Sequence, residues 1–148
     1  MITIDIYNFT QTKIITKQFS ELAERARKIL IKDKRITSKK DFLIEVSFVG
    51  DTKITQLNKQ HHKKNRPTDV VSLSYFEADP RDPDTFAGEI FISVPYARRQ
   101  AAQIKQSLNE ELKFLFVHGL LHVFGYDHMK EIEEKHMLDL TYAVLKRK

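Results

Sequence analysis

Apolar residues in the first half of the chain follow two different periods. Every second residue is apolar over residues 2–8 and 43–49, as in the run Ile2, Ile4 and Ile6, and this period predicts strands with one buried face. Over residues 16–34 and 51–61 the apolar residues recur three or four apart, which predicts amphipathic helices. Asp51 is the expected N-cap of the second helix.

The second half continues with two strands and three helices. Residues 70–76 and 88–94 are rich in β-branched and aromatic residues and predict strands, separated by an acidic, proline-containing segment, 77–87, that predicts an exposed loop. Pro95 suits the first residue of a helix to about residue 107. Asn109 is the expected start of an apolar helix to about 124, and a last amphipathic helix spans 130–146.

The predicted order is β-α-β-α-β-β-α-α-α, in which the third and fourth strands are consecutive and suit a hairpin. We therefore expect an α+β fold, with a mixed sheet of about four strands and about five helices covering one side. A chain of 148 residues with 41% apolar and 30% charged residues is most simply one globular domain over 1–148.

Composition narrows the classes of function. The chain has no cysteine, which excludes disulfides, thiolate ligands and cysteine nucleophiles. No basic segment followed by an apolar run opens the sequence, and no apolar stretch approaches a membrane span, so we expect a cytoplasmic protein. Residues 1–70 hold 15 Lys and Arg against 8 Asp and Glu, net +7, whereas residues 71–148 hold 10 against 12, net −2. The basic half suits a polyanionic partner or, equally, a solvated lysine-rich surface.

Three histidines near the end of the apolar helix carry the candidate chemistry. His118 and His122 are four residues apart and so project from one helix face. Gly125 can end the helix in the left-handed conformation, after which His128 can return to the first two. Three imidazoles around an open fourth position are a ligand set of catalytic zinc. The alternative is a set of satisfied core histidines, but buried imidazoles need partners and a metal provides them.

The spacing of these histidines equals that of the metzincin proteases, HExxHxxGxxH, with one difference. Gly119 occupies the position of the glutamate that serves as general base in those enzymes. We therefore predict one zinc ion per chain at a hydrolytic site that is not a peptidase site, on the central helix and the turn after it. Imidazole ligands also suit other transition metals.

Three motifs together resemble one known family. The run HGLLHVFGYDH at 118–128 resembles the signature HGxLHLxGYDH of the YbeY family of bacterial rRNA maturation factors. The segment from Leu57-Asn58 through RPTDVVS at 66–72 is similar to that family's LNxxYRxxDxPTDVLSF, and GEIFIS at 88–93 is similar to its GDIxIS. The resemblance covers roughly residues 40–142 and keeps the order of the three motifs.

The resemblance implies an activity and a set of partners. It implies an α+β zinc protein, with the metal on His118, His122 and His128, that cleaves single-stranded RNA in 16S rRNA 3′-end maturation and ribosome quality control. The expected partners are RNA, in particular 16S rRNA and the small ribosomal subunit, and neither a membrane nor DNA. The residue chemistry agrees, because a Lewis-acid metal can activate a phosphoryl group and single-stranded RNA suits a basic cleft.

The basic segment before Pro67 departs from the family pattern. His62 stands where the family usually has an arginine, so it is our candidate catalytic residue, as a phosphate ligand when protonated or as a proton-transfer group. The alternative, which is equally consistent with the sequence, is that His62 is a surface histidine in a basic loop. Lys63, Lys64 and Arg66 are the candidate phosphate ligands that replace the missing cation.

Other residues in the motifs have structural alternatives. Asp127 can orient a ligand imidazole or cap the last helix, and Thr68 and Asp69 can line the cleft or form the turn after Pro67. Glu89 stands where aspartate is common and is expected to be structural. Leu73-Ser74 in place of Phe-Pro indicates a change in packing, and His61 and His136 are expected at the surface.

Two other functions stay open at this point. The first is a ribosome-assembly or RNA-binding factor whose metal is mainly structural, which Gly119 and His62 both favour. The second is a metallohydrolase acting on another ester or amide.

Overall fold

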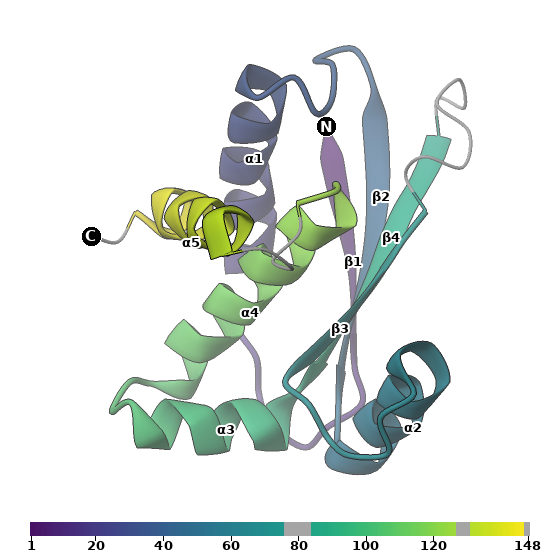
Figure 1. Cartoon of the computed structure of the whole chain (residues 1–148), viewed down its shortest axis with the longest axis vertical. Helices are drawn as coiled ribbons and strands as arrows, with labels where there is room; N and C mark the ends of the chain where they lie inside the picture. Colours follow the sequence, from purple (N-terminus) through teal and green to yellow (C-terminus); the bar gives the residue numbers. More distant parts are fainter. Residues whose placement is uncertain (76–83, 127–130, 147–148) are drawn as a thin grey trace.

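The computed structural model describes residues 1–75, 84–126 and 131–146, and within these ranges the predicted element order is confirmed (Figure 1). Their elements are β1 (Ile2–Asn8), α1 (Lys17–Lys32), β2 (Asp41–Val49), α2 (Asp51–His62), β3 (Val70–Ser74), β4 (Asp84–Ser93), α3 (Val94–Gln103), α4 (Leu108–Val123) and α5 (Glu131–Leu145). The strands form one mixed sheet in the order β1-β2-β4-β3, in which only the β3–β4 pair is antiparallel. The fold class is therefore α+β, as expected.

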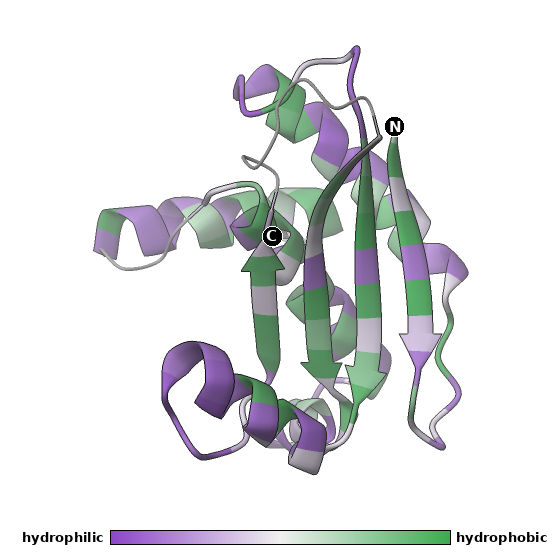
Figure 2. Ribbon diagram, turned by 90° about the vertical axis from the view of Figure 1, so that its right-hand side faces the viewer, coloured by the Kyte–Doolittle hydropathy of each residue, from purple (hydrophilic) through white to green (hydrophobic). Residues whose placement is uncertain are grey.

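Helix α5 packs against α1 and α4, and these two helices cover one face of the sheet (Figure 1). They bury the large apolar residues that alternate along β2 and β4, and Phe19, Phe48 and Phe116 meet there in tilted and edge-on ring contacts. The expectation that all helices lie on one side is wrong for α2, which lies in front of the opposite face (Figure 2). Ile54 and Leu57 of α2 pack there against Val71 and Phe91, which the strand period points away from α4.

The boundaries of the last two strands differ from those expected. β4 begins at Asp84 and not at Gly88, so residues 84–87 of the predicted loop are strand, while 76–83 lie outside the described residues. The register against β2 shifts between Leu43 and Ile44, which leaves Ala87 as the extra residue of a bulge. A Cβ at Gly88 would lie 2.5 Å from the Leu73 carbonyl oxygen, so the hairpin needs glycine here.

Two of the expected helix caps are also wrong. Gly50, and not Asp51, is the N-cap of α2, and Asp51 lies in its first turn. Ser107, and not Asn109, caps α4, because its Oγ accepts a hydrogen bond from the Glu110 N–H at 3.1 Å. Asn109 instead exchanges side-chain hydrogen bonds with Gln18 of α1.

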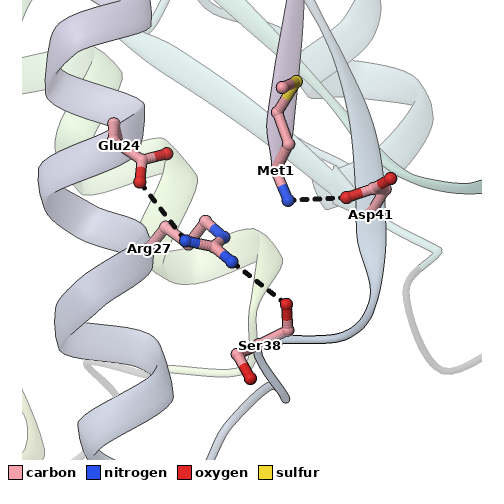
Figure 3. A network of polar contacts seen from close by, with 5 residues as sticks. All are labelled: Met1, Glu24, Arg27, Ser38 and Asp41. Atoms are coloured by element: carbon pink, nitrogen blue, oxygen red, sulfur yellow. Dashed lines mark hydrogen bonds and ion pairs between the residues drawn. The ribbon is translucent and has the colours of Figure 1, made fainter.

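A small polar network fixes the connection from α1 to β2 (Figure 3). Arg27 donates to the Glu24 carboxylate at 3.2 Å and to the Ser38 carbonyl at 3.1 Å. The Met1 ammonium lies 2.6 Å from an Asp41 carboxylate oxygen and holds the pKa of that carboxyl below its usual range. Within the described residues, no helix is both long and apolar enough to cross a membrane.

Candidate functional site

A cleft of about 870 Å³ lies along β3, between α4 and the segment that joins α2 to β3. Its lining combines ionisable, polar and apolar side chains from α2, β3, α3 and α4 and from the segment before β3. The lining residues are Asn58, His62, Lys64, Arg66, Pro67, Thr68, Asp69, Val70, Ser72, Tyr96, Phe114, Leu115, His118 and His122. The cleft therefore brings together residues from both of the sequence motifs that carry candidate chemistry.

Helix α4 supplies two imidazoles to one wall of the cleft. His118 and His122 lie on consecutive turns, both line the cleft, and both are half-buried. The His118 ring stacks on Phe114, with 5.9 Å between ring centroids and an interplanar angle of 13°. The predicted pair is thus on one helix face, and its apolar neighbour holds the His118 ring in a defined plane.

The turn after α4 fixes the orientation of His122. Gly125 has φ 96°, and the N–H groups of Gly125 and Tyr126 donate to the carbonyls of His122 and Leu121, both at 3.1 Å. These are the two bonds of a Schellman motif, so glycine ends the helix as predicted. The Tyr126 carbonyl then lies 2.7 Å from His122 Nδ1. A carbonyl only accepts, so Nδ1 is the donor, and in the neutral ring Nε2 then has the lone pair.

Tyr126 itself is anchored by the end of α1, a contact that the sequence did not reveal. Its hydroxyl donates to the Asp33 carboxylate, and Arg35 lies over its ring with the guanidinium carbon 4.2 Å from the centroid. Burial, and then the hydrogen bond to Asp33, raise the pKa of Tyr126 to about 12. The neutral tyrosine thus ties the turn that holds His122 to the C-terminal end of α1.

The predicted ligand His128 and the predicted orienting residue Asp127 lie outside the described residues. The described part of the chain therefore supplies two of the three predicted imidazoles.

The opposite wall of the cleft is basic. His62 from the end of α2, and Lys64 and Arg66 from the segment that follows, all line it. The buried Asn58 holds this segment in place, because its Nδ2 donates to the Arg66 carbonyl at 2.9 Å. Lys63, the fourth predicted residue of this group, is the left-handed C-cap of α2 with φ 57° and is not among the lining residues.

Thr68 and Asp69 line the same cleft, and Asp69 also organises the backbone. Its carboxylate accepts from the Val70 N–H at 2.7 Å and from Gln100 of α3 at 3.3 Å. Its carbonyl accepts from the Ser93 N–H at 2.9 Å, which closes the β3–β4 pairing. Asp69 thus combines the lining and turn roles that the sequence left open. Tyr96 and Phe114 also line the cleft and were not identified as site residues from the sequence.

The residues that line the cleft do not include Glu89, His61 or His136. Glu89 lies on the sheet face opposite α4, beside Glu45 of β2, and burial, then the charge of Glu45, raise its pKa. His61 is exposed near Glu89, and its charge lowers that pKa. His136 is exposed on α5, with Nε2 4.0 Å from Asp33 Oδ2.

Gly119 and Ser74 have packing roles. A Cβ at Gly119 would lie 2.9 Å from Ile90 Cγ2 and 3.0 Å from Ser72 Oγ, so α4 lies directly on β3 and β4. A glutamate side chain at this position, as in the metzincin motif, would clash with the residues of the sheet. Ser74 Oγ donates to the Val123 carbonyl at 2.5 Å and satisfies an open carbonyl at the end of α4. This bond gives a packing role to Ser74, which stands in place of the proline of the family's Phe-Pro pair.

Comparison with known proteins identifies the family. The family model described as "Endoribonuclease YbeY" matches residues 5–148. The chain belongs to the YbeY family. YbeY relatives include the endoribonuclease YbeY of Malacoplasma penetrans, 32% identical, covering 96% of this chain and 93% of that protein. That of Acholeplasma laidlawii is 35% identical and covers 97% and 96%. A solution structure from Thermotoga maritima aligns with a TM-score of 0.61 at 25% identity, covering 99% of this chain and 90% of that one.

The donor set fits the metal that the YbeY resemblance implies. His118 and His122 lie on one face of α4. Because His122 Nδ1 donates its proton to the Tyr126 carbonyl, Nε2 is the nitrogen that can bind a metal. Metal-bound histidines characteristically donate their other ring N–H to a carbonyl or carboxylate in this way. The residues of the described part of the cleft are therefore compatible with a transition metal.

The hydrogen bond to Tyr126 predicts the tautomer of His122 in the metal-free protein. We expect a neutral imidazole with the proton on Nδ1, because the carbonyl 2.7 Å away can only accept. Long-range ¹H–¹⁵N NMR spectra above the histidine pKa distinguish the two nitrogens. His61, exposed on α2, is the control and should show the Nε2–H form that dominates in free imidazoles. A His122 spectrum with the proton on Nε2 would contradict the assigned hydrogen bond.

Proposed function

We propose that this chain is a metal-dependent endoribonuclease that cleaves single-stranded RNA in the maturation of the 16S rRNA 3′ end. The observation that carries the proposal is the pairing of two walls in one cleft. His118 and His122 face it from α4, and Lys64 and Arg66 face it from the segment after α2. The family membership supports RNA as the substrate, and the expected place of action is the small ribosomal subunit in the cytoplasm.

The ligands that we assign to the metal are His118, His122 and His128, with one zinc ion per chain. When bound, such an ion would act as a Lewis acid toward a phosphoryl oxygen of the RNA. Asp127 is assigned to orient a ligand imidazole. The hydrogen bond between His122 Nδ1 and the Tyr126 carbonyl supports the assignment, because it keeps His122 in the orientation and tautomer that a ligand needs.

The basic wall would hold the RNA backbone. Lys64 and Arg66 provide fixed positive charge, and Arg66 can form two parallel hydrogen bonds to one phosphate. Asn58 supports this role, because its bond to the Arg66 carbonyl fixes the backbone from which both cations project. Tyr96 and Phe114 add aromatic surface on which unpaired bases can stack.

His62 is the residue that we assign to proton transfer. It lines the same cleft as the histidines of α4, and the two nitrogens of an imidazole can donate and accept a proton. A protonated His62 would also pair with phosphate, as the arginine of the family pattern would. Lys64 and Arg66 already provide permanent positive charge on this wall. His62 is the residue of this wall that can exchange a proton, so we assign proton transfer to it and phosphate binding to the other two.

A peptidase is disfavoured by the packing at Gly119. The 2.9 Å and 3.0 Å approaches to Ile90 and Ser72 leave no room there for a carboxylate that faces the cleft. The hydrolase proposal therefore depends on phosphate chemistry, which the Lys64 and Arg66 wall favours.

Replacing His118 by Ala tests the metal and the activity together. We expect metal content to fall from about one ion per chain to a small fraction, and cleavage of a single-stranded RNA to fall about 100-fold or more, because a direct ligand is lost. Metal analysis and gel-based cleavage assays measure the two effects. His61→Ala, an exposed histidine outside the cleft, is the matched control and should keep both.

Two outcomes would contradict this assignment. A full complement of metal in His118→Ala would remove His118 from the site. Cleavage that persists in this variant after stringent purification would show that the measured activity does not come from the assigned site.

Neighbouring lysines separate a phosphate contact from general surface charge. Lys64→Ala should weaken binding of a single-stranded oligoribonucleotide and lower the slope of log affinity against log salt by about 0.7, because one phosphate contact is lost. Lys63→Ala removes the same charge one residue away, outside the lining of the cleft, and should leave that slope nearly unchanged. Fluorescence anisotropy titrations at several salt concentrations measure both. Equal slopes for the two variants would contradict the assigned role of Lys64.

A further inference from the structure

A second hollow, of about 440 Å³, lies where the three parallel strands end. Phe9, Gly50 and Val94, the residues that directly follow β1, β2 and β4, all line it. Thr10, Gln11, Thr12, Pro95, Arg98 and Arg99 complete the lining. The carboxyl end of parallel strands is where open α/β sheets bind ligands, and a volume of this size suits a small one.

The charge of this hollow is positive. Its lining includes two arginines and no carboxylate. Arg99 is paired with Asp51 at 2.9 Å, so its charge is partly neutralised. Exposed Arg98 donates to the Thr12 hydroxyl at 3.0 Å, and within the described residues it forms no ion pair. The remaining guanidinium donors of Arg98 are therefore suited to an anion from solution.

The rim of the hollow is aromatic and preformed. Phe9 is 72% exposed, and its ring is stacked with that of Tyr7, with 6.5 Å between the ring centroids. The loop beside it is held by its own hydrogen bonds, because Asn8 accepts from the Thr10 N–H at 2.9 Å and donates to the Thr12 carbonyl at 2.8 Å. An exposed phenylalanine on a rigid loop offers a flat surface on which a nucleobase can stack.

Helix α3 connects this hollow to the cleft. Tyr96 lines the cleft, and Arg99, three residues later, lines the hollow. The Arg99 guanidinium carbon lies 5.2 Å from the centroid of the Tyr96 ring, so the two side chains are in contact. An RNA strand that left the cleft past Tyr96 would therefore reach Arg99 and the hollow.

We propose that this hollow binds a nucleotide of the same single-stranded RNA outside the cleft, with Arg98 on a phosphate and Phe9 stacked on a base. The proposal rests on the proposed function. It assigns to Arg98 and Phe9 a role in affinity for longer RNA and not in the cleavage chemistry.

Binding of two RNA lengths tests the proposal. A trinucleotide and a decanucleotide, both unpaired and fluorescently labelled, are titrated with the full chain in the presence of a chelator, so that no cleavage shortens them. The wild-type chain should bind the decanucleotide more tightly. Arg98→Glu should reduce that affinity about tenfold and change the affinity for the trinucleotide less than about twofold, because phosphate attraction dominates such binding.

Matched variants separate the contact from charge and from folding. Arg98→Lys keeps the positive charge and should retain most of the increase in affinity from the trinucleotide to the decanucleotide. Lys28→Glu makes a similar charge change at an exposed position of α1 and should alter both affinities less than about twofold. Phe9→Ala should lose about fivefold on the decanucleotide, whereas Phe9→Trp should keep the affinity, because stacking tolerates any large ring.

The outcomes distinguish this inference from the proposed function. A wild-type chain that neither binds nor cleaves RNA overturns both. A chain that cleaves RNA and binds longer RNA more tightly, with the gain unchanged in Arg98→Glu and Phe9→Ala, overturns only the second site. Binding of AMP as tightly as the decanucleotide, lost in Arg98→Glu, would assign the hollow to a free nucleotide and also overturn the RNA-strand proposal.

Discussion

The direct contact of α4 with β3 and β4 is the constraint on which the rest of the site depends. It requires a residue without a side chain at Gly119, whose Cα faces Ile90 and Ser72, and a second one at Gly88, against Val123 and the Leu73 carbonyl. Glycine inside a helix costs about 1 kcal/mol relative to alanine. Because of these glycines, α4 packs closely against β3 and β4. His118 and His122 can then line the same cleft as His62 at the end of α2.

Two separate sets of contacts then fix the side chains and the backbone on the two walls of the cleft. The Schellman turn at Gly125 presents the Tyr126 carbonyl to His122, and Asp33 and Arg35 hold the Tyr126 side chain at the end of α1. On the other wall Asn58 holds the backbone of Arg66, and Asp69 fixes the start of β3 to α3 and β4. On both walls a side chain of the cleft is therefore bonded to a backbone group, through Asn58 and Asp69 on one side and His122 on the other.

Much of this could be predicted from the sequence, because local patterns carried it. The element order, the mixed sheet and the helix end at Gly125 follow from hydrophobic period and from turn chemistry. The caps at Gly50 and Ser107 were missed because each competes with a good capping residue one or two positions later. The position of α2 on the second face, the absence of Lys63 from the cleft lining, and the Asp33–Tyr126 bond depend on long-range packing, which no local pattern contains.

The central claim is that the histidines of α4 hold a metal within the RNA-binding cleft. A crystal structure of the zinc-loaded chain, with anomalous diffraction measured on both sides of the zinc absorption edge, tests it most directly. The account predicts one anomalous peak per chain within about 2.0–2.1 Å of Nε2 of His118 and of His122. An anomalous peak elsewhere on the chain, or zinc bound through the His122 Nδ1 atom that faces the Tyr126 carbonyl, would contradict it.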